Sequence, residues 1–353
     1  MKSSRIARGM VLVGAWAALA PIGLLAQEKW NGPTDGPVAQ TGKSVVYIAS
    51  DLRNGSIGIV YRGLQEAAQK LGWNVALKDG MGSAEKQSDA LSAAIAEHPH
   101  AIVFGGFDPN AFAAQLSAIE SKRIVLVGWH AAKVPGPTRE LFVNVATDPL
   151  DVARLAANFV IHDAMEKKRQ VGVIIFNDPQ FSVANAKTEA MRKTIQACQG
   201  YKGCKVLAVE NLPISATSSE IPRAVPRLVG THGAAWTYSL AINDAYFDAM
   251  NFPLREARRS DILHVSAGDG SPKALSRIAW GMSQQLATVA EPLKMQGYQL
   301  ADELNRAFAG ETPSGYVSRP ILVTHAFLKA MGTSDIESAL GFEAAYSAIW
   351  KGQ

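Results

Sequence analysis

Five positions in this sequence place a polar or aromatic side chain just after a short apolar run, where a buried strand would end. They are Asn54, the pair Trp129 and His130, the pair Asn243 and Asp244, Asp269, and Glu291. Amide, carboxylate and imidazole groups exchange hydrogen bonds with hydroxyl groups, and an aromatic face packs against C–H groups. Such side chains at equivalent strand ends predict a shared cleft that binds a small molecule.

Some of these positions also have a purely structural interpretation. Asn54 precedes Gly55 and could form a simple turn, Asp244 could cap the helix that follows it, and Trp129 could belong to a core. A single such residue carries little weight. Their repetition at equivalent strand ends is what favours a cleft.

The elements that would position these residues alternate along the chain. Strands are predicted at 45–49, 74–77, 101–104, 124–127 and 141–145, and again at 171–176, 205–209, 234–240, 262–265 and 287–290. Helices are predicted at 56–72, 84–97, 109–121, 149–166, 182–198, 217–229, 244–250, 272–279 and 292–309. Short apolar strands that alternate with amphipathic helices indicate parallel sheets with helices on both sides. We therefore predict an α/β fold of two doubly wound lobes, which bind ligands beyond the carboxyl ends of their strands.

The first 26 residues are typical of a secretory signal. Basic residues precede the apolar stretch 10–25, and Ala26 supplies a small residue for cleavage before Gln27. An uncleaved membrane anchor is the alternative. We expect a periplasmic protein cleaved near Ala26, with a flexible lead-in over 27–43.

The charge of the chain depends strongly on this leader. Removing residues 1–26 lowers the formal net charge from +4 to +1. A nearly neutral chain offers no electrostatic basis for binding nucleic acid. We therefore expect a small-molecule ligand rather than a nucleic acid.

The chain has two cysteines, Cys198 and Cys204, separated by five residues. In an oxidising compartment such a pair predicts a disulfide that supports stability rather than binding. A redox or metal pair is the alternative, although the spacing is not C-x-x-C. We expect no metal and no cofactor.

The opening segment 47–75 resembles the first strand, loop and helix of the periplasmic sugar-binding proteins of ABC importers, with the type I, ribose-binding-like fold. Residues 268–272, with the sequence GDGSP, resemble the F-D-G-T-P segment of that family, and 287–292 resemble its approach to the hinge. The resemblance covers about residues 44–325. It implies an N-terminal lobe at 44–147 plus 292–319, a C-terminal lobe at 148–291 plus 320–353, and a three-segment hinge near Thr147, Glu291 and Arg319.

The resemblance also assigns roles to the strand-end residues. Asn54 and Asn243 match ligand-binding asparagines of the two lobes, and Asp269 matches an acceptor of sugar hydroxyls. Positions that depart from the family pattern are Ser56 (usually aromatic), Trp129 with His130 (an Asp-Arg pair), Asn185 (Arg) and Glu291 (Gln). None of the matched positions is Arg or Lys, which argues against a carboxylate or phosphate ligand. We expect Trp129 to offer its ring face and its indole N–H to the ligand.

The predicted function is a monomeric periplasmic solute-binding protein. It would capture a neutral sugar or polyol between its lobes and deliver it to an ABC permease, with no catalytic residues. One alternative is a ligand sensor for a membrane histidine kinase, and another is an exported α/β enzyme. The segment 268–274 also matches the dinucleotide pattern G-x-G-x-x-A, but its aspartate would face a pyrophosphate.

Overall fold

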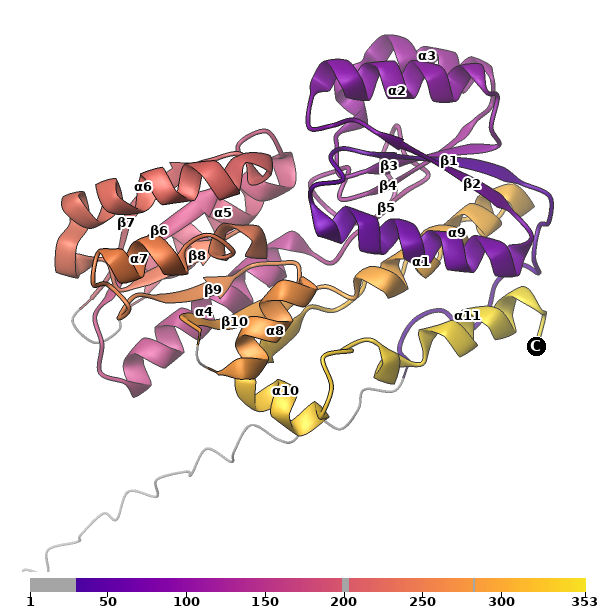
Figure 1. Ribbon diagram of the computed structural model, residues 1–353. Coiled ribbons are helices and arrows are strands. Elements are labelled where there is room, and N and C mark those ends of the chain that lie inside the picture. Colours follow the sequence, from indigo (N-terminus) through magenta and orange to yellow (C-terminus); the bar gives the residue numbers. More distant parts are fainter. Residues whose placement is uncertain (1–29, 199–202, 282) are drawn as a thin grey trace, which may run out of the picture.

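The computed structural model describes residues 30–198, 203–281 and 283–353 of the 353-residue chain. It has two lobes side by side, each built on one sheet with helices on both faces (Figure 1). The predicted α/β class with two parallel-sheet lobes is therefore confirmed. The predicted leader lies outside the described residues.

The first lobe contains a fully parallel sheet in the order β2-β1-β3-β4-β5. Its strands are β1 (Ser44–Ala49), β2 (Asn74–Asp79), β3 (Ala101–Gly105), β4 (Val125–Trp129) and β5 (Val143–Val145). One face is covered by α1 (Gly55–Leu71) and α9 (Leu293–Ala309), and the other by α2 (Ala84–Ala96), η1 (Pro109–Phe112) and α3 (Ala113–Ser121). Alternate residues of β1 are buried on opposite faces, as expected for a strand between two layers of helices.

Helices α1 and α9 pack closely because each has a glycine at their contact. A Cβ atom on Gly63 would lie 2.4 Å from the carbonyl oxygen of Lys294, and one on Gly297 would lie 2.4 Å from the carbonyl oxygen of Val60. Only a residue without a side chain allows the two backbones to approach this closely. The contact fixes α9, which comes from a late part of the chain, in the first lobe.

The second lobe contains a sheet in the order β11-β10-β9-β8-β6-β7, parallel except for β11. Its strands are β6 (Val171–Asn177), β7 (Cys204–Asn211), β8 (Tyr238–Ala241), β9 (Leu263–Ser266), β10 (Gln285–Ala290) and β11 (Ile321–Thr324). Its α-helices are α4 (Pro149–Glu166), α5 (Ser182–Ala197), α6 (Thr217–His232), α7 (Asn251–Glu256), α8 (Pro272–Trp280) and α10 (His325–Met331). The 3-10 turns are η2 (Ile214–Ala216), η3 (Gly233–Ala235) and η4 (Asp244–Phe247). The predicted Cys198–Cys204 disulfide is present between the segment that follows α5 and the first residue of β7.

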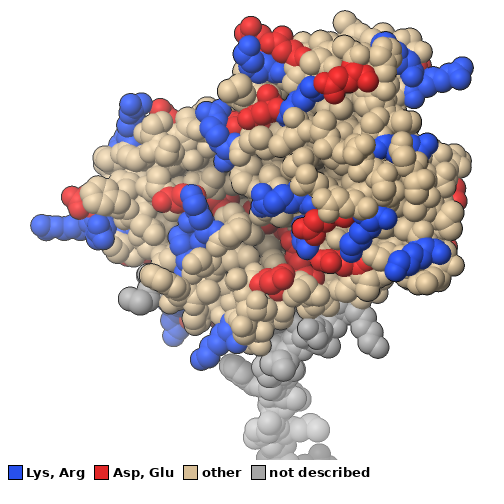
Figure 2. Space-filling model, turned by 45° about the vertical axis from the view of Figure 1, so that its right-hand side comes forward, with Lys and Arg blue, Asp and Glu red and all other residues tan. Residues whose placement is uncertain are grey.

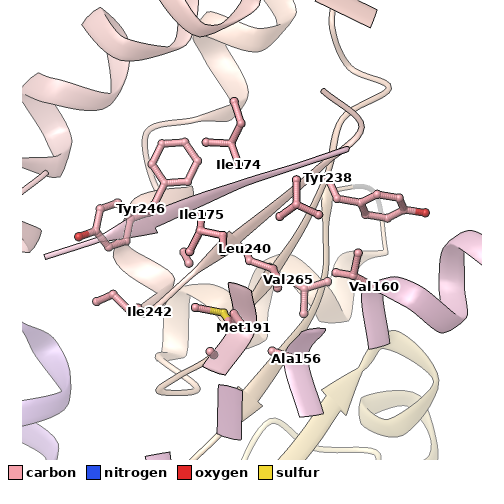
Figure 3. Packing of buried hydrophobic residues seen from close by; sticks show 14 of the residues in the cluster. Ala156, Val160, Ile174, Ile175, Met191, Tyr238, Leu240, Ile242, Tyr246 and Val265 are labelled. Atoms are coloured by element: carbon pink, nitrogen blue, oxygen red, sulfur yellow. The ribbon is translucent and has the colours of Figure 1, made fainter. Parts of the chain in front are cut away.

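The core of the second lobe is apolar and continuous across the sheet. Figure 3 shows Ile175, Leu240 and Val265 from neighbouring strands, with Ala156 of α4 and Met191 of α5 packed against the same sheet. All five residues are buried. This packing holds the strand ends at fixed positions.

The chain passes between the lobes around 147, around 291, in the segment 310–320 and once more between residues 331 and 342. A buried hydrogen-bond network joins the first three passages. The Oγ1 atom of Thr147 lies 2.7 Å from the Oγ atom of Ser318. The Nε2 atom of Gln296 donates to both hydroxyl groups, at 3.1 and 3.0 Å, and lies 3.4 Å from Glu291 Oε2. Each buried polar group thus finds partners within the hinge.

The C-terminal end of the chain differs from the predicted domain boundaries. After β11 and α10 in the second lobe, and the turn η5 (Ser338–Leu340), helix α11 (Phe342–Trp350) packs in the core of the first lobe beside α9. The assignment of all of 320–353 to the second lobe is therefore wrong for α11. Phe342, Tyr346, Ile349 and Trp350 are buried there, and burial of these apolar side chains is the physical reason.

The expectation of a flexible lead-in is also wrong for its described part, residues 30–43. The Trp30 ring contacts the Tyr346 ring at a centroid distance of 5.1 Å. The backbone N–H of Ala39 donates to Trp350 O at 2.9 Å, and Asn305 Nδ2 donates to Pro37 O at 2.8 Å. This segment is therefore packed against the first lobe. No helix in the described ranges has both the length and the apolar character that a bilayer span requires.

Candidate functional site

A cavity of about 50 Å³ lies between the two lobes, beyond the carboxyl ends of their strands. The first lobe contributes Ser50, Asn54, Ile57, Gly106, Trp129 and His130. The second lobe contributes Phe181, Val183, Ala184, Lys187, Ile214, Ile242, Asn243 and Asp269. The strand order reverses at β1 in the first sheet and at β6 in the second, and doubly wound sheets bind ligands at such points. Topology therefore places this cavity where a ligand would be expected.

Asn54 is positioned by the start of α1. Its side-chain oxygen accepts a hydrogen bond from the backbone N–H of Ser56 at 3.2 Å and so caps the helix. The structural and the ligand-binding interpretations of this residue therefore coexist, because the amide also lines the cavity. Ser56, the second residue of the helix, is buried and is not one of the lining residues.

Trp129 ends β4 and is buried, with its indole N–H donating to Gln296 Oε1 at 2.7 Å. We expected this N–H to serve the ligand, but in this structure a hinge residue accepts it. One face of the ring is stacked on His130, with 4.3 Å between the ring centroids. His130 in turn places its Nε2 atom 2.9 Å from Glu291 Oε2.

Asn243 and Asp269 follow β8 and β9 and form a pair. The Nδ2 atom of Asn243 donates to Asp269 Oδ2 at 2.7 Å, and its Oδ1 atom accepts from Ala245 N–H at 2.9 Å. Asp244 holds the loop that carries Asp269, since its Oδ2 atom accepts from the backbone N–H groups of residues 269, 270 and 271. Burial raises the pKa of Asp244 to about 6, although these backbone donors favour the charged form.

Lys187, which was not predicted as a site residue, lies on α5 and lines the cavity beside the hinge residue Glu291. Its Nζ atom is 3.1 Å from Glu291 Oε1 and 3.9 Å from Asp269 Oδ1. Its side chain is only 3% exposed, so the charge is held inside the protein. A sequence signal existed: Lys187 lies on the buried face of α5, with Ala184, Met191 and Ile195 at helical spacing.

The two carboxylates that face Lys187 are shifted in opposite directions. Burial alone would raise the pKa of Glu291, but the charges of His130 and Lys187 outweigh it and hold the pKa below its ordinary value. Burial raises the pKa of Asp269; Lys187 opposes this effect and Glu291 adds to it. Glu291 thus acts as the counter-ion of the hinge. Asp269 is the carboxyl that lines the cavity and can accept hydroxyl groups.

Asn185 lies away from this cavity. Its Oδ1 atom accepts from Asn177 Nδ2 and its Nδ2 atom donates to Pro179 O, both at 3.0 Å. The residue is exposed and does not line the cavity, so the structure does not bring it together with the other predicted site residues. Glu291 does not line the cavity either, but it contacts His130 and Lys187, which do. Among the described residues, no three His, Cys, Asp or Glu side chains are grouped in a way that could hold a metal ion.

Comparison with known proteins agrees with this architecture. The family model described as periplasmic binding protein domain matches residues 45–312. No curated protein sequence shows a significant match. Three solved structures each superpose with a TM-score of 0.70, and the identity in each case is low enough to indicate the fold alone.

All three structures are named as binding proteins, and two of them as solute-binding proteins of transporters. The glucose-galactose binding protein GanP from Geobacillus stearothermophilus is 16% identical, over 81% of this chain and 99% of its own. A carbohydrate transporter solute-binding protein from Agrobacterium radiobacter, in complex with D-arabinose, is 19% identical over 85% and 99%. A 5-methylthioribose transporter solute-binding protein from Thermotoga lettingae is 16% identical over 86% and 96%.

Proposed function

The chain belongs to the periplasmic binding protein family, and on that premise we propose that it is the solute-binding component of an ABC importer. It captures a small neutral sugar or polyol between its lobes in the periplasm and presents it to a permease. The observation that carries this proposal is the cavity between the lobes, lined by strand ends of both sheets. The sugar-binding proteins with the same fold support it.

The polar groups of the cavity suit hydroxyl groups. Asp269 accepts hydrogen bonds, and the amides of Asn54 and Asn243 can both donate and accept. Lys187 lines the cavity, but its charge is shared by Glu291 and Asp269. The charge of Lys187 therefore has two anionic partners already, which disfavours a carboxylate or phosphate ligand.

Lobe closure is the proposed signal to the permease. A ligand that touches Asn54 and Trp129 on one side and Asn243 and Asp269 on the other stabilises the closed arrangement through its contacts with both lobes. On the face shown in Figure 2, acidic and basic side chains are intermixed rather than gathered into a patch of one sign. This distribution agrees with a small-molecule ligand rather than a nucleic acid.

A thermal-shift screen of sugars and polyols tests the binding role. A ligand present at 100 times its dissociation constant stabilises the folded state by about 2.7 kcal/mol, which raises the melting temperature visibly. Small-angle scattering should then give a smaller radius of gyration with the best ligand than without it. A screen in which no sugar or polyol raises the melting temperature would remove the proposal, and recovery of a chemically changed ligand would favour an enzyme.

A further inference from the structure

A second, smaller cavity adjoins the first one between the two lobes. The two cavities share four lining residues, Ser50, Asn54, Phe181 and Ile214. The smaller one is formed by the segments that follow β1 and β2 in the first lobe and β6 and β7 in the second. Among the described residues, none of those that contact Glu291 lines it. The binding cleft therefore continues beyond the cavity that holds Lys187 and Asp269.

The smaller cavity is lined mainly by polar side chains. Its other lining residues are Asp51, Gly82, Asp178, Gln180 and Ser215. Within the described parts of the chain, the side chains of Ser50, Gln180 and Ser215 form no hydrogen bond, and neither does the amide nitrogen of Asn54. Hydroxyl and amide groups without protein partners are available to hydroxyl groups of a ligand.

Asp178 is the buried carboxylate of the smaller cavity that lacks a cationic partner. It is only 1% exposed. Its Oδ1 atom accepts from Gln180 N–H at 3.1 Å and its Oδ2 atom from Ile214 N–H at 2.9 Å, and no Lys, Arg or His among the described residues forms an ion pair with it. Asp51, by contrast, is paired with Arg53 at 2.7 Å. Each oxygen of Asp178 has a second lone pair, so a donor on the ligand can complete its hydrogen bonding.

The volumes of the two cavities limit what each can hold. The first measures about 50 Å³ and the second about 20 Å³. One water molecule requires about 10–15 Å³ of such a cavity, so the second has room for roughly one or two polar groups beyond those in the first. A short substituent on a ligand would fill it. The linkage to that substituent would pass between the shared residues of the second lobe, Phe181 and Ile214, and those of the first, Ser50 and Asn54.

On the basis of the proposed function, we propose that the ligand is a sugar or polyol with a short hydroxylated extension, such as a glycerol unit in glycosidic linkage. Its main part lies against Asp269 and Lys187. The extension enters the smaller cavity, where its hydroxyl groups donate to Asp178 and exchange hydrogen bonds with Ser215. The ether oxygen of the linkage has no hydrogen to donate and can accept from the Asn54 amide. The smaller cavity thus selects extended ligands among those that the larger cavity accepts.

Glycosides that differ only in their substituent test this proposal. Calorimetry would compare galactosylglycerol with methyl and propyl galactoside, and glucosylglycerol with methyl and propyl glucoside. Any further sugar from the thermal-shift screen would be tested in the same three forms, and an open-chain polyol would be compared with the alditol two carbons longer. The glyceryl form should bind about 10- to 100-fold more tightly than the methyl form, as expected for two added hydrogen bonds. The propyl form, which has the same length without hydroxyl groups, should show no such gain.

The outcomes separate this inference from the proposed function. Glyceryl and methyl forms that bind equally would overturn the inference and leave the proposed function standing. A propyl form that binds as tightly as the glyceryl form would also overturn it, because the gain would then come from length and not from hydroxyl groups. Absence of binding by every sugar and polyol in the screen would remove the proposed function itself.

Three substitutions locate the preference in the smaller cavity. Gln180→Ala and Ser215→Ala each remove a polar group from it without changing the larger cavity, which neither residue lines. Each should reduce the preference for the glyceryl form about three- to tenfold, and Asp178→Asn, which replaces an acceptor oxygen by a donor, should reduce it at least as much. Ser219→Ala, at an exposed position of α6 outside both cavities, is the control and should leave the preference unchanged. A preference unchanged in all three cavity variants would refute the assignment of the smaller cavity.

Discussion

The two lobes have the same strand order, β2-β1-β3-β4-β5 in the first and β7-β6-β8-β9-β10 in the second, yet they present different chemistry to the cavity. The first lobe contributes mainly neutral groups, among them the Asn54 amide and the Trp129 ring. The second lobe contributes the charged side chains of Lys187 and Asp269, together with the Asn243 amide and five apolar residues. Shared topology therefore fixes where a ligand binds, while the side chains of each lobe determine what is bound.

The largest expected effect is on stability and comes from removing the positive charge of Lys187, which faces the carboxylates of Glu291 and Asp269. Lys187→Met leaves Glu291 and Asp269 buried without their lysine partner, which should lower the free energy of unfolding by about 3–5 kcal/mol. Urea denaturation at neutral pH measures the loss. Adding Glu291→Gln to the variant should recover part of it. A single variant as stable as the wild type would show that the buried charges are independent.

Loss of the second-lobe acceptor should weaken binding more than any first-lobe change. Asp269→Ala removes the charged partner of ligand hydroxyls, which should cost about 1.5–3 kcal/mol, or about 10- to 150-fold in affinity. Calorimetry with the best sugar or polyol from the screen measures it. Glu256→Ala, an exposed carboxylate on α7, is the control. Equal affinities for the wild type and Asp269→Ala would place the ligand elsewhere.

The second lobe should also account for a loss of stability in acid, through His264. This residue is fully buried on β9, stacks on Phe247 at 4.8 Å, and has no hydrogen-bond partner for either ring nitrogen in the described structure. Burial lowers its pKa from 6.5 to about 3, and the charge of Arg277 adds to this effect. Below pH 6.5 the unfolded chain therefore binds a proton that the folded chain does not.

The resulting loss of stability should develop as the pH falls from about 6.5 toward 3. At pH 5 it should reach about 2 kcal/mol, since each unit of pKa difference corresponds to 1.36 kcal/mol. The measurement is the unfolding free energy at pH 7 and at pH 5. Its decrease between these two pH values should be about 2 kcal/mol smaller in His264→Leu than in the wild type. The same loss in both proteins would assign the acid sensitivity to other groups.

The smallest expected effect belongs to the first lobe. Asn54→Asp keeps an oxygen that can cap α1 but removes the amide donor, so affinity should fall by about 0.5–1.5 kcal/mol, or about 2- to 13-fold, while stability is retained. Asn54→Ala should lose the cap as well, at about 1 kcal/mol of unfolding free energy. Calorimetry and urea denaturation on both variants separate the two roles. A decrease in affinity larger than that of Asp269→Ala would reverse the ranking of the lobes.

Much of this architecture was predictable because the periodic signals are strong. The strands of both sheets up to β10 and the longer helices have clear apolar patterns, and the cavity does lie at the strand ends that carry Asn54, Trp129, Asn243 and Asp269. The elements β11, α10 and α11 were not predicted. They are short, with four, seven and nine residues, and they are stabilised by packing against distant segments rather than by a local pattern.

One predicted site residue that does not line the cavity and one lining residue that was not predicted lie on the same helix. Asn185 and Lys187 are two positions apart on α5, a rotation of about 200° around a helix with 3.6 residues per turn. Asn185 and Lys187 therefore lie on nearly opposite faces of the helix, and only the face of Lys187 is directed toward the cavity. A lysine is usually exposed, so only its partners on other segments, Glu291 and Asp269, reveal that Lys187 is buried, and these contacts depend on the tertiary structure.

The packing of α11 into the first lobe has a consequence for the order in which the protein folds. The core of this lobe combines residues near position 45, residues of α9 around 300 and residues 342–350, so the second lobe is inserted between its parts. Contacts that span nearly the whole chain form slowly, because the intervening segment must first be brought together. The strands of the second lobe between α4 and β10 are contiguous in sequence and can assemble during synthesis, whereas the first lobe must wait for the last turn of the chain. Removal of α11 would therefore impair the lobe that is synthesised first.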